Sequence, residues 1–221
     1  MQARIVVLAG VNGAGKSSVA GEAIREAGGE FFNPDVAARS LLDGHPGMSI
    51  EQANAQAWEL GRQGLERAFV RGEFFAFETT LGGNTIPGML RKGAGKGAAI
   101  HVSYVGLATA ELHIQRVRSR VAAGGHDIPE KKIRERYRTS RAKLITLMPV
   151  LASLRVYDNS VEADPDTGAR PKPVLLLRMT RGKVVEHAPL ETIPAWAKPL
   201  LAAALKIVTA RKKGSDPSGG V

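Results

Sequence analysis

The chain has 221 residues, of which 43% are hydrophobic and 24% are charged, proportions typical of a globular protein large enough to bury a core. It contains no cysteine, which excludes disulfides and thiolate metal sites, and its five histidines lack the spacing of metal ligands. No apolar run approaches the roughly 18 residues that cross a bilayer, and residues 1–4 lead into an apolar strand rather than a cleavable signal. We therefore expect a cytoplasmic protein with no membrane segment and no structural metal.

The formal net charge is +10, which predicts a partner that is either nucleic acid or a small molecule rich in phosphate. Much of the excess positive charge lies in residues 116–141 and near the C-terminus, around residues 206–213. Residues 213–221 contain almost no apolar side chains, so we expect a disordered tail there.

An apolar run over residues 4–9 predicts a strand buried in a parallel sheet. A helix is expected from Lys16 through Ile24. Between strand and helix lies a Walker A motif, G-x-x-x-x-G-K-[ST], made by Gly10, Val11, Asn12, Gly13, Ala14, Gly15, Lys16 and Ser17. The alternative, a glycine-rich turn with an exposed lysine, is disfavoured because strand, loop and helix follow in the required order.

The chemistry of this motif predicts a site for ATP and Mg²⁺. The glycines let the backbone aim its N–H groups at phosphate oxygens, and the helix that follows adds its positive dipole end. Lys16 would neutralise the β- and γ-phosphates, and the Ser17 hydroxyl would complete the coordination of Mg²⁺. Ser18 is expected to form hydrogen bonds nearby.

The remaining patterns predict one α/β domain over residues 1–212. Further strands are expected over residues 30–33, 74–77, 100–107 and 154–159, and helices over residues 50–70, 85–92, 109–122 and 129–148. This alternation predicts a parallel sheet of about five strands flanked by helices. Residues 171–211 predict an antiparallel hairpin and a final helix that begins at Pro194.

A phosphate-binding loop alone does not distinguish a kinase from a GTPase or a motor ATPase. The chain lacks the Asn-Lys-x-Asp that reads guanine, and no predicted strand ends in the Asp-Glu pair of a hydrolysing ATPase. The helical hairpin of residues 109–148 fits a kinase lid, because arginine suits a transferring phosphoryl group. It carries Arg116, Arg118, Arg120, Arg134, Arg136, Arg138 and Arg141, any one of which could instead belong to a solvated face.

Several motifs over about residues 4–160 resemble the zeta-toxin-type kinases. They are Gly10 to Ser17, Asn33-Pro34-Asp35, Phe77-Glu78-Thr79-Thr80-Leu81, Gly124-Gly125-His126-Asp127-Ile128-Pro129 and Arg134 to Ser140. The resemblance implies a P-loop kinase that phosphorylates a sugar hydroxyl of UDP-N-acetylglucosamine. It also implies an antitoxin partner that covers the nucleotide site.

The resemblance assigns roles to acidic residues that follow two strands. Asp35 matches the catalytic aspartate that takes the proton of the acceptor hydroxyl, and its place beside the carboxyl end of a strand agrees with this role. The alternative role of Asp35 is the N-cap of a helix over residues 36–42. Glu78 matches the acidic residue near the substrate, with Thr79 and Thr80 as hydroxyl donors, and its alternative is a solvent-facing strand end.

The family places two lid arginines on the γ-phosphate. Arg116 and Arg120 share a helix face, as do Arg134 and Arg138, so one member of each pair can converge on ATP. We predict Arg120 and Arg134 as the catalytic pair. His126, in the turn of the lid, is a further candidate contact, with a structural role as its alternative.

Three functions remain open at this point. The first is transfer of the γ-phosphate of ATP to a hydroxyl of a small molecule, for which a UDP-sugar is the leading acceptor. The second is a nucleic-acid end kinase, which the positive charge favours and the scarcity of aromatic side chains disfavours. The third is a nucleotide-gated binding module without transferase activity, which would have no need of a base such as Asp35.

Overall fold

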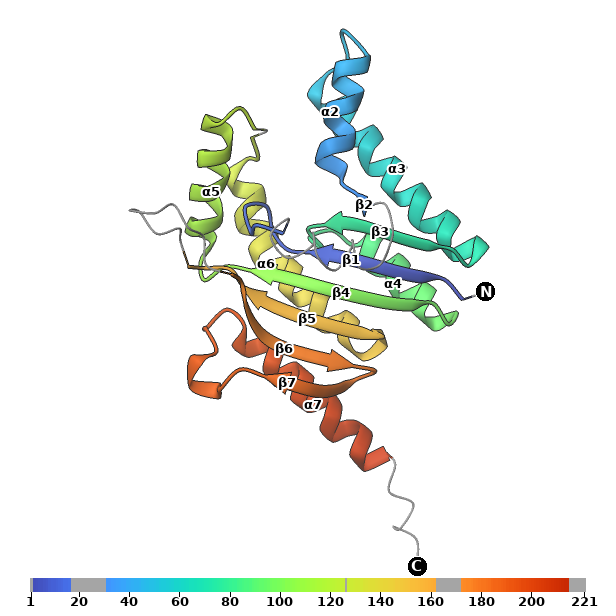
Figure 1. Cartoon of the computed structure of the whole chain (residues 1–221), viewed down its shortest axis with the longest axis vertical. Coiled ribbons are helices and arrows are strands. Elements are labelled where there is room, and N and C mark those ends of the chain that lie inside the picture. The colour runs from blue at the N-terminus through green and yellow to red at the C-terminus, as the bar shows by residue number, and fades with distance from the viewer. Residues whose placement is uncertain (1, 17–30, 126, 162–171, 215–221) are drawn as a thin grey trace, which may run out of the picture.

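A computed structural model describes residues 2–16, 31–125, 127–161 and 172–214. Within these residues the strands form one sheet in the order β2-β3-β1-β4-β5-β6-β7 (Figure 1). The strands are β1 (Arg4–Ala9), β2 (Phe31–Phe32), β3 (Phe74–Thr79), β4 (Ala99–Gly106), β5 (Ser153–Asp158), β6 (Val174–Thr180) and β7 (Lys183–His187). The first five are parallel, β6 pairs antiparallel with β5, and β7 pairs antiparallel with β6. The predicted α/β fold with a five-stranded parallel sheet and a C-terminal hairpin is therefore confirmed.

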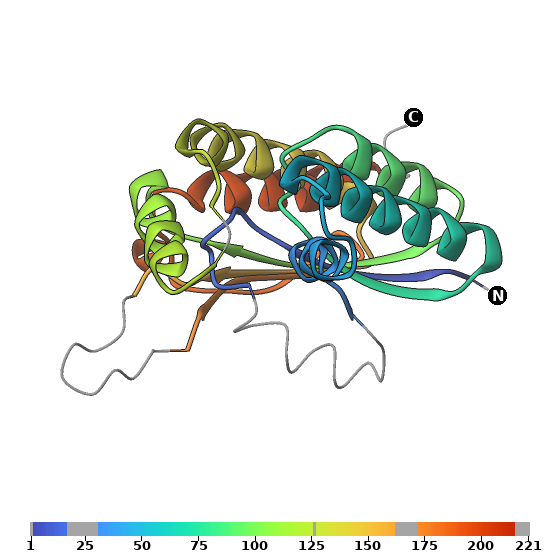
Figure 2. The ribbon, with the colours of Figure 1, turned by 90° about the horizontal axis from the view of Figure 1, so that it is seen from above.

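The helices of the described residues are α2 (Pro34–Gly44), α3 (Ile50–Arg71), α4 (Thr85–Gly95), α5 (Ala110–Ala122), α6 (Glu130–Leu147) and α7 (Lys198–Gly214). Helices α3, α4, α6 and α7 lie along one face of the sheet (Figure 2). Helix α5 stands at the carboxyl ends of the parallel strands, and α2 projects beyond the sheet (Figure 1). No helix in the described part of the chain has the length and apolar character needed to span a membrane.

The core forms where alternate strand residues meet these helices. Ile5 and Val7 of β1 are fully buried, because β1 is flanked on both sides by parallel neighbours and covered by helices. Leu65 of α3, Leu90 of α4 and Leu144 of α6 pack into the same cluster. Side chains with period 2 on the strands and near period 4 on the helices therefore make one continuous apolar layer.

The C-terminal part of the chain differs most from the sequence prediction. The last helix begins at Lys198 rather than Pro194, because a short 3₁₀ turn over Leu190–Thr192 and the turn after it precede the helix, which continues to Gly214. The C-terminal hairpin joins the parallel sheet through antiparallel pairing of β6 with β5. The predicted helix after Lys16 and most of the predicted tail lie outside the described residues.

Candidate active site

The loop that follows β1 has the backbone of a phosphate-binding turn. Gly10, Gly13 and Gly15 have φ angles of 144°, 80° and 76°, in the region that L side chains rarely adopt. A Cβ atom at Gly10 would lie 2.2 Å from the carbonyl oxygen of Val105, and one at Gly13 would lie 2.6 Å from that of His113. Both the conformation of the loop and its packing against β4 and α5 therefore require glycine at these positions.

Lys16 folds back over this loop. Its Nζ donates to the carbonyl oxygens of Gly10 at 2.9 Å and Val11 at 3.4 Å, and it lies 3.1 Å from Glu78 Oε1. The Lys16 side chain is 6% exposed and that of Glu78 is 15% exposed. Because Leu8 pairs with Glu78 in parallel register, β3 delivers its carboxylate beside the loop, and Glu78 is not a solvent-facing strand end.

Asp35 lies in the first turn of α2, next to this pair. The N-cap of α2 is Asn33, whose Oδ1 accepts from the backbone N–H groups of Asp35 at 2.8 Å and Val36 at 3.4 Å. The alternative reading of Asp35 as the N-cap is therefore wrong. The Asp35 carboxylate is 44% exposed and points across to α5, where it lies 3.6 Å from Arg120 Nη1.

Helices α5 and α6 each bring one arginine to the site. Arg120 of α5 reaches Asp35, and Arg136 of α6 donates from Nη1 to Asn12 Oδ1 at 2.8 Å. Burial lowers the pKa of Arg136 below its ordinary value, and the nearby Asp35 charge acts in the opposite direction. Arg136 thus lies in the electrostatic field of the candidate base.

The other predicted lid residues lie elsewhere. Arg134 forms an exposed ion pair with Glu111 rather than contacting the loop, and Arg116 donates to the carbonyl oxygen of Val161. Arg138 is exposed on α6. Arg120 is therefore the member of the predicted catalytic pair that lies next to Asp35, whereas Arg134 is held at the first turn of α5.

His113 of α5 holds the loop through a hydrogen bond to its backbone. Its Nδ1 lies 2.9 Å from the carbonyl oxygen of Asn12, and since a carbonyl only accepts, Nδ1 carries the proton. The ring is 1% exposed, and burial lowers the pKa of His113 to about 4. Asn159, which follows β5, donates from Nδ2 to the carbonyl oxygen of Ala14 at 2.8 Å. The loop is thus anchored to α5, to α6 and to the end of β5.

The two threonines after Glu78 shape the turn that leaves β3. Thr79 Oγ1 accepts from the backbone N–H of Leu81 at 3.1 Å, and Thr80 Oγ1 accepts from that of Gly82 at 3.4 Å. Ser140 of α6 donates to the carbonyl oxygen of Thr80 at 2.6 Å. These bonds use the threonine oxygens as acceptors, so each hydroxyl proton can still serve as a donor.

Sequence reasoning missed Asn33 and His113 as parts of the site, and it named Arg136 only as one of seven lid arginines. Arg136 follows Ile133 by three positions and precedes Ser140 by four, and both of those residues are buried on the inward face of α6. Helical spacing shows that these three positions share a face of α6, but it does not show that this face meets the loop. The predicted residues Ser17, Ser18 and His126 lie outside the described residues.

Comparison with known sequences gives one relative of the chain but no family. No family model matches the chain. An uncharacterised protein of Haemophilus influenzae is 29% identical over 142 residues, which make up 62% of this chain and 94% of that protein.

Solved structures share the fold at low sequence identity. A chain of the AvrRxo1-ORF1:-ORF2 complex is 16% identical with a TM-score of 0.62, and the match covers 93% of this chain and 71% of that one. In the same complex with ATP the TM-score is 0.60 at 16% identity, and the match covers 92% of this chain and 64% of the other. A chain of the PezAT toxin-antitoxin system of Streptococcus pneumoniae is 15% identical with a TM-score of 0.51, covering 95% and 87% of the two chains.

Proposed function

Because the chain has the zeta-toxin-type P-loop kinase fold, we propose that it is an ATP-dependent kinase that phosphorylates a hydroxyl group of a small molecule. The observation that carries the proposal is the meeting of Lys16, Asp35, Glu78, Arg120 and Arg136 around one phosphate-binding loop. A binding module would need the loop and a cation. It would not need a carboxylate on the acceptor side.

The geometry supports a separate role for each of these residues in the transfer reaction. The backbone of the loop would bind the α- and β-phosphates, and Lys16 would exchange Glu78 for the β- and γ-phosphate oxygens. Arg120 and Arg136 would contact the γ-phosphoryl oxygens, where negative charge is held during transfer. Asp35 would accept the proton of the acceptor hydroxyl as its oxygen bonds to the γ-phosphorus and the bond to the leaving ADP oxygen breaks.

The oxygen ligands near the loop fit Mg²⁺, which prefers carboxylate, hydroxyl and phosphate oxygens. Within the described residues no cluster of three acidic or histidine side chains forms a separate metal cage. Ser17, by its position in the motif, and Glu78 would hold the ion together with the phosphates. When bound, Mg²⁺ would neutralise charge on the β- and γ-phosphate oxygens.

The acceptor and the partner follow from the resemblance to zeta-toxin-type kinases. We infer a UDP-sugar such as UDP-N-acetylglucosamine as the acceptor, which is a phosphate-rich small molecule suited to a chain of net charge +10. A protein partner of the antitoxin kind is also proposed. The fold matches supporting it come from the AvrRxo1-ORF1:-ORF2 complex and from the PezAT toxin-antitoxin system.

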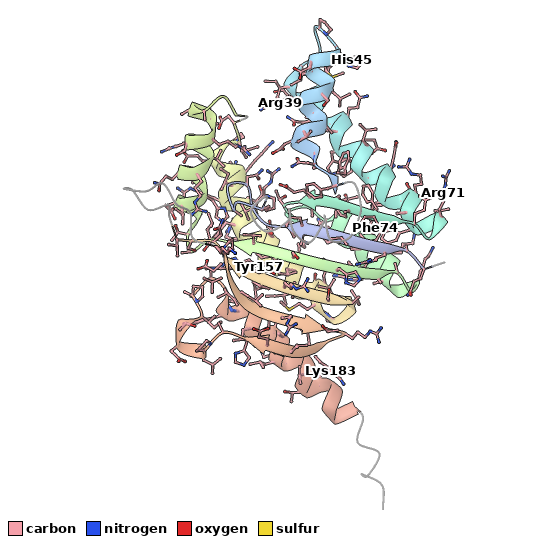
Figure 3. The ribbon with its side chains drawn as sticks, in the orientation of Figure 1. Arg39, His45, Arg71, Phe74, Tyr157 and Lys183 are labelled. Carbon is pink, nitrogen blue, oxygen red and sulfur yellow. The ribbon has the colours of Figure 1, made fainter. Side chains whose placement is uncertain are left out.

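Transfer from γ-labelled ATP tests the proposal directly. The acceptors would be UDP-N-acetylglucosamine, a set of other nucleotide sugars, a metabolite extract and a 5′-hydroxyl oligonucleotide. We expect label on a small molecule with the wild-type chain, and almost none with Lys16→Ala. Lys183→Ala is the matched control, because Lys183 is an exposed lysine that begins β7 at the end of the sheet opposite the loop (Figure 3). Label on the oligonucleotide alone would favour the end kinase, and ATP binding without transfer would favour the binding module.

A further inference from the structure

Both ends of the Asn33 side chain are engaged at the site. Its Nδ2 donates to Glu78 Oε2 at 3.3 Å, and its Oδ1 accepts from the first backbone N–H groups of α2. Only one orientation of the amide satisfies these partners, since the reverse would place Oδ1 against a carboxylate and NH₂ against N–H donors. The environment therefore specifies asparagine from both sides.

Asn33 closes a continuous chain of contacts across the site. Lys16 takes one oxygen of the Glu78 carboxylate and Asn33 takes the other. From Asn33 the chain continues through the N–H of Asp35 to the residue proposed as the base. Lys16 and Glu78 are largely shielded from water, where hydrogen bonds of this kind are stronger and an unpaired group costs more.

A simple cap would not need this arrangement. Ser49 and Thr109, the N-caps of α3 and α5, each use only a hydroxyl oxygen to accept from a backbone N–H. In Asn33 the oxygen does the same work, while the amide nitrogen makes a second bond to an acidic residue 45 positions away in the sequence. The nitrogen therefore serves a purpose other than capping.

We infer that Asn33 is a positioning residue that couples the phosphate site to the acceptor base, an inference that rests on the proposed kinase function. When the phosphates take Lys16 from Glu78, the glutamate keeps its bond to Asn33. Asn33 then keeps Glu78 and the first turn of α2 in the same relative position, and the Asp35 carboxylate stays directed at the acceptor. Without the Nδ2 donor, Glu78 would be free to follow Lys16 towards the nucleotide or to turn away.

The test separates the two ends of the side chain. Asn33→Ser keeps a good N-cap but removes the donor to Glu78, so the thermal midpoint should change little. We expect kcat to fall about 10- to 100-fold, as for a misplaced catalytic group, with the KM for ATP within about twofold of wild type. Ser49→Ala is the matched control, because it removes the N-cap of a helix without touching the loop, and should lower the thermal midpoint but not kcat.

Asn33→Asp is a second variant that keeps the helix cap and removes the donor to Glu78. Aspartate caps a helix as well as asparagine does, but its carboxylate has no hydrogen to donate to Glu78. We therefore expect kcat to fall at least as far as in Asn33→Ser, with the KM for ATP again within about twofold of wild type.

The outcomes distinguish the inference from the function on which it rests. Full kcat in both Asn33→Ser and Asn33→Asp, with an active wild type, would overturn the positioning role and leave the kinase proposal standing. A wild-type chain that binds ATP but transfers no phosphate would overturn the kinase proposal, and the positioning role with it.

Discussion

The carboxylate of Asp35 and the guanidinium of Arg120 lie 3.6 Å apart, so the first turn of α2 is joined to the last turn of α5. Both side chains are more than one third exposed, so this pair contributes little to the stability of the fold. Its importance concerns function. A γ-phosphate would compete with Asp35 for Arg120, and nucleotide binding would thereby release the carboxylate for the acceptor.

We predict that Asp35→Asn lowers phosphoryl transfer by at least about a hundredfold, because the amide cannot accept the acceptor's proton. The dissociation constant for ATP, measured by calorimetry, should stay within a few-fold of wild type. Asp43→Asn is the matched control, since Asp43 is an exposed aspartate near the other end of the same helix. Wild-type turnover in Asp35→Asn would remove Asp35 as the base and leave Glu78 as the remaining candidate.

Arg136→Ala and Arg134→Ala should have different effects on turnover. Arg136 contacts Asn12 of the loop, so its loss should lower kcat by about a hundredfold or more, the scale of a lost donor to transition-state charge. Arg134 is paired with Glu111 on the exposed surface of the lid, so its loss should change kcat only a few-fold. Steady-state kinetics with both variants would show which arginine of α6 contributes to turnover. A larger loss of kcat with Arg134→Ala would support Arg120 and Arg134, the catalytic pair predicted from the sequence.

His113 should make the stability of the fold depend on pH. Its pKa is lowered from 6.5 to about 4, so the unfolded chain binds a proton at pH values where the folded protein does not. The free energy of unfolding is therefore unaffected above about pH 6.5 and falls as the pH drops towards 4, by about 2 kcal/mol at pH 5. Urea unfolding at pH 7.5 and pH 5 should show this difference in wild type and a smaller one in His113→Gln. The exposed His187, changed to Gln, should leave the difference intact.

Substitution of a loop glycine should separate ATP binding from general stability. In Gly13→Ala the new Cβ would lie 2.6 Å from a backbone oxygen at a φ of 80°, so the loop must shift. We expect ATP to raise the thermal midpoint of this variant far less than that of wild type. Gly88→Ala, in α4, meets nothing within 4 Å and should stabilise the protein by roughly 0.5–1 kcal/mol without affecting ATP binding. A normal response to ATP in Gly13→Ala would contradict the assigned loop geometry.

The order of strands and helices could be predicted from the sequence because each element carries its own period and its own end signals. The capping box at Ser49 marks the start of α3, and the β-branched run of β1 marks a buried strand. The attachment of the C-terminal hairpin to β5 could not be predicted, because antiparallel pairing between distant segments leaves no local signal.

Within the site, the residues fixed by a motif or by the end of a strand were predicted, namely Lys16, Asp35 and Glu78. Spacing along one helix could not rank Arg134 against Arg136, because the choice depends on which face of α6 meets the loop. The bond of Asn33 to Glu78 was hidden for a similar reason, since the two residues lie 45 positions apart in the sequence.

The position of β1 in the sheet determines how rigidly each part of the site is held. β1 is hydrogen-bonded to parallel neighbours on both sides, whereas β2, which leads into α2, has two residues and, among the residues that the structure describes, pairs only with β3. In hydrogen exchange, the amides of β1 should open only with global unfolding, and those at the start of α2 should open through local fluctuations. The nucleotide would thus bind at the end of a strand that is paired on both sides, and the acceptor would bind next to a strand that is paired on one side only.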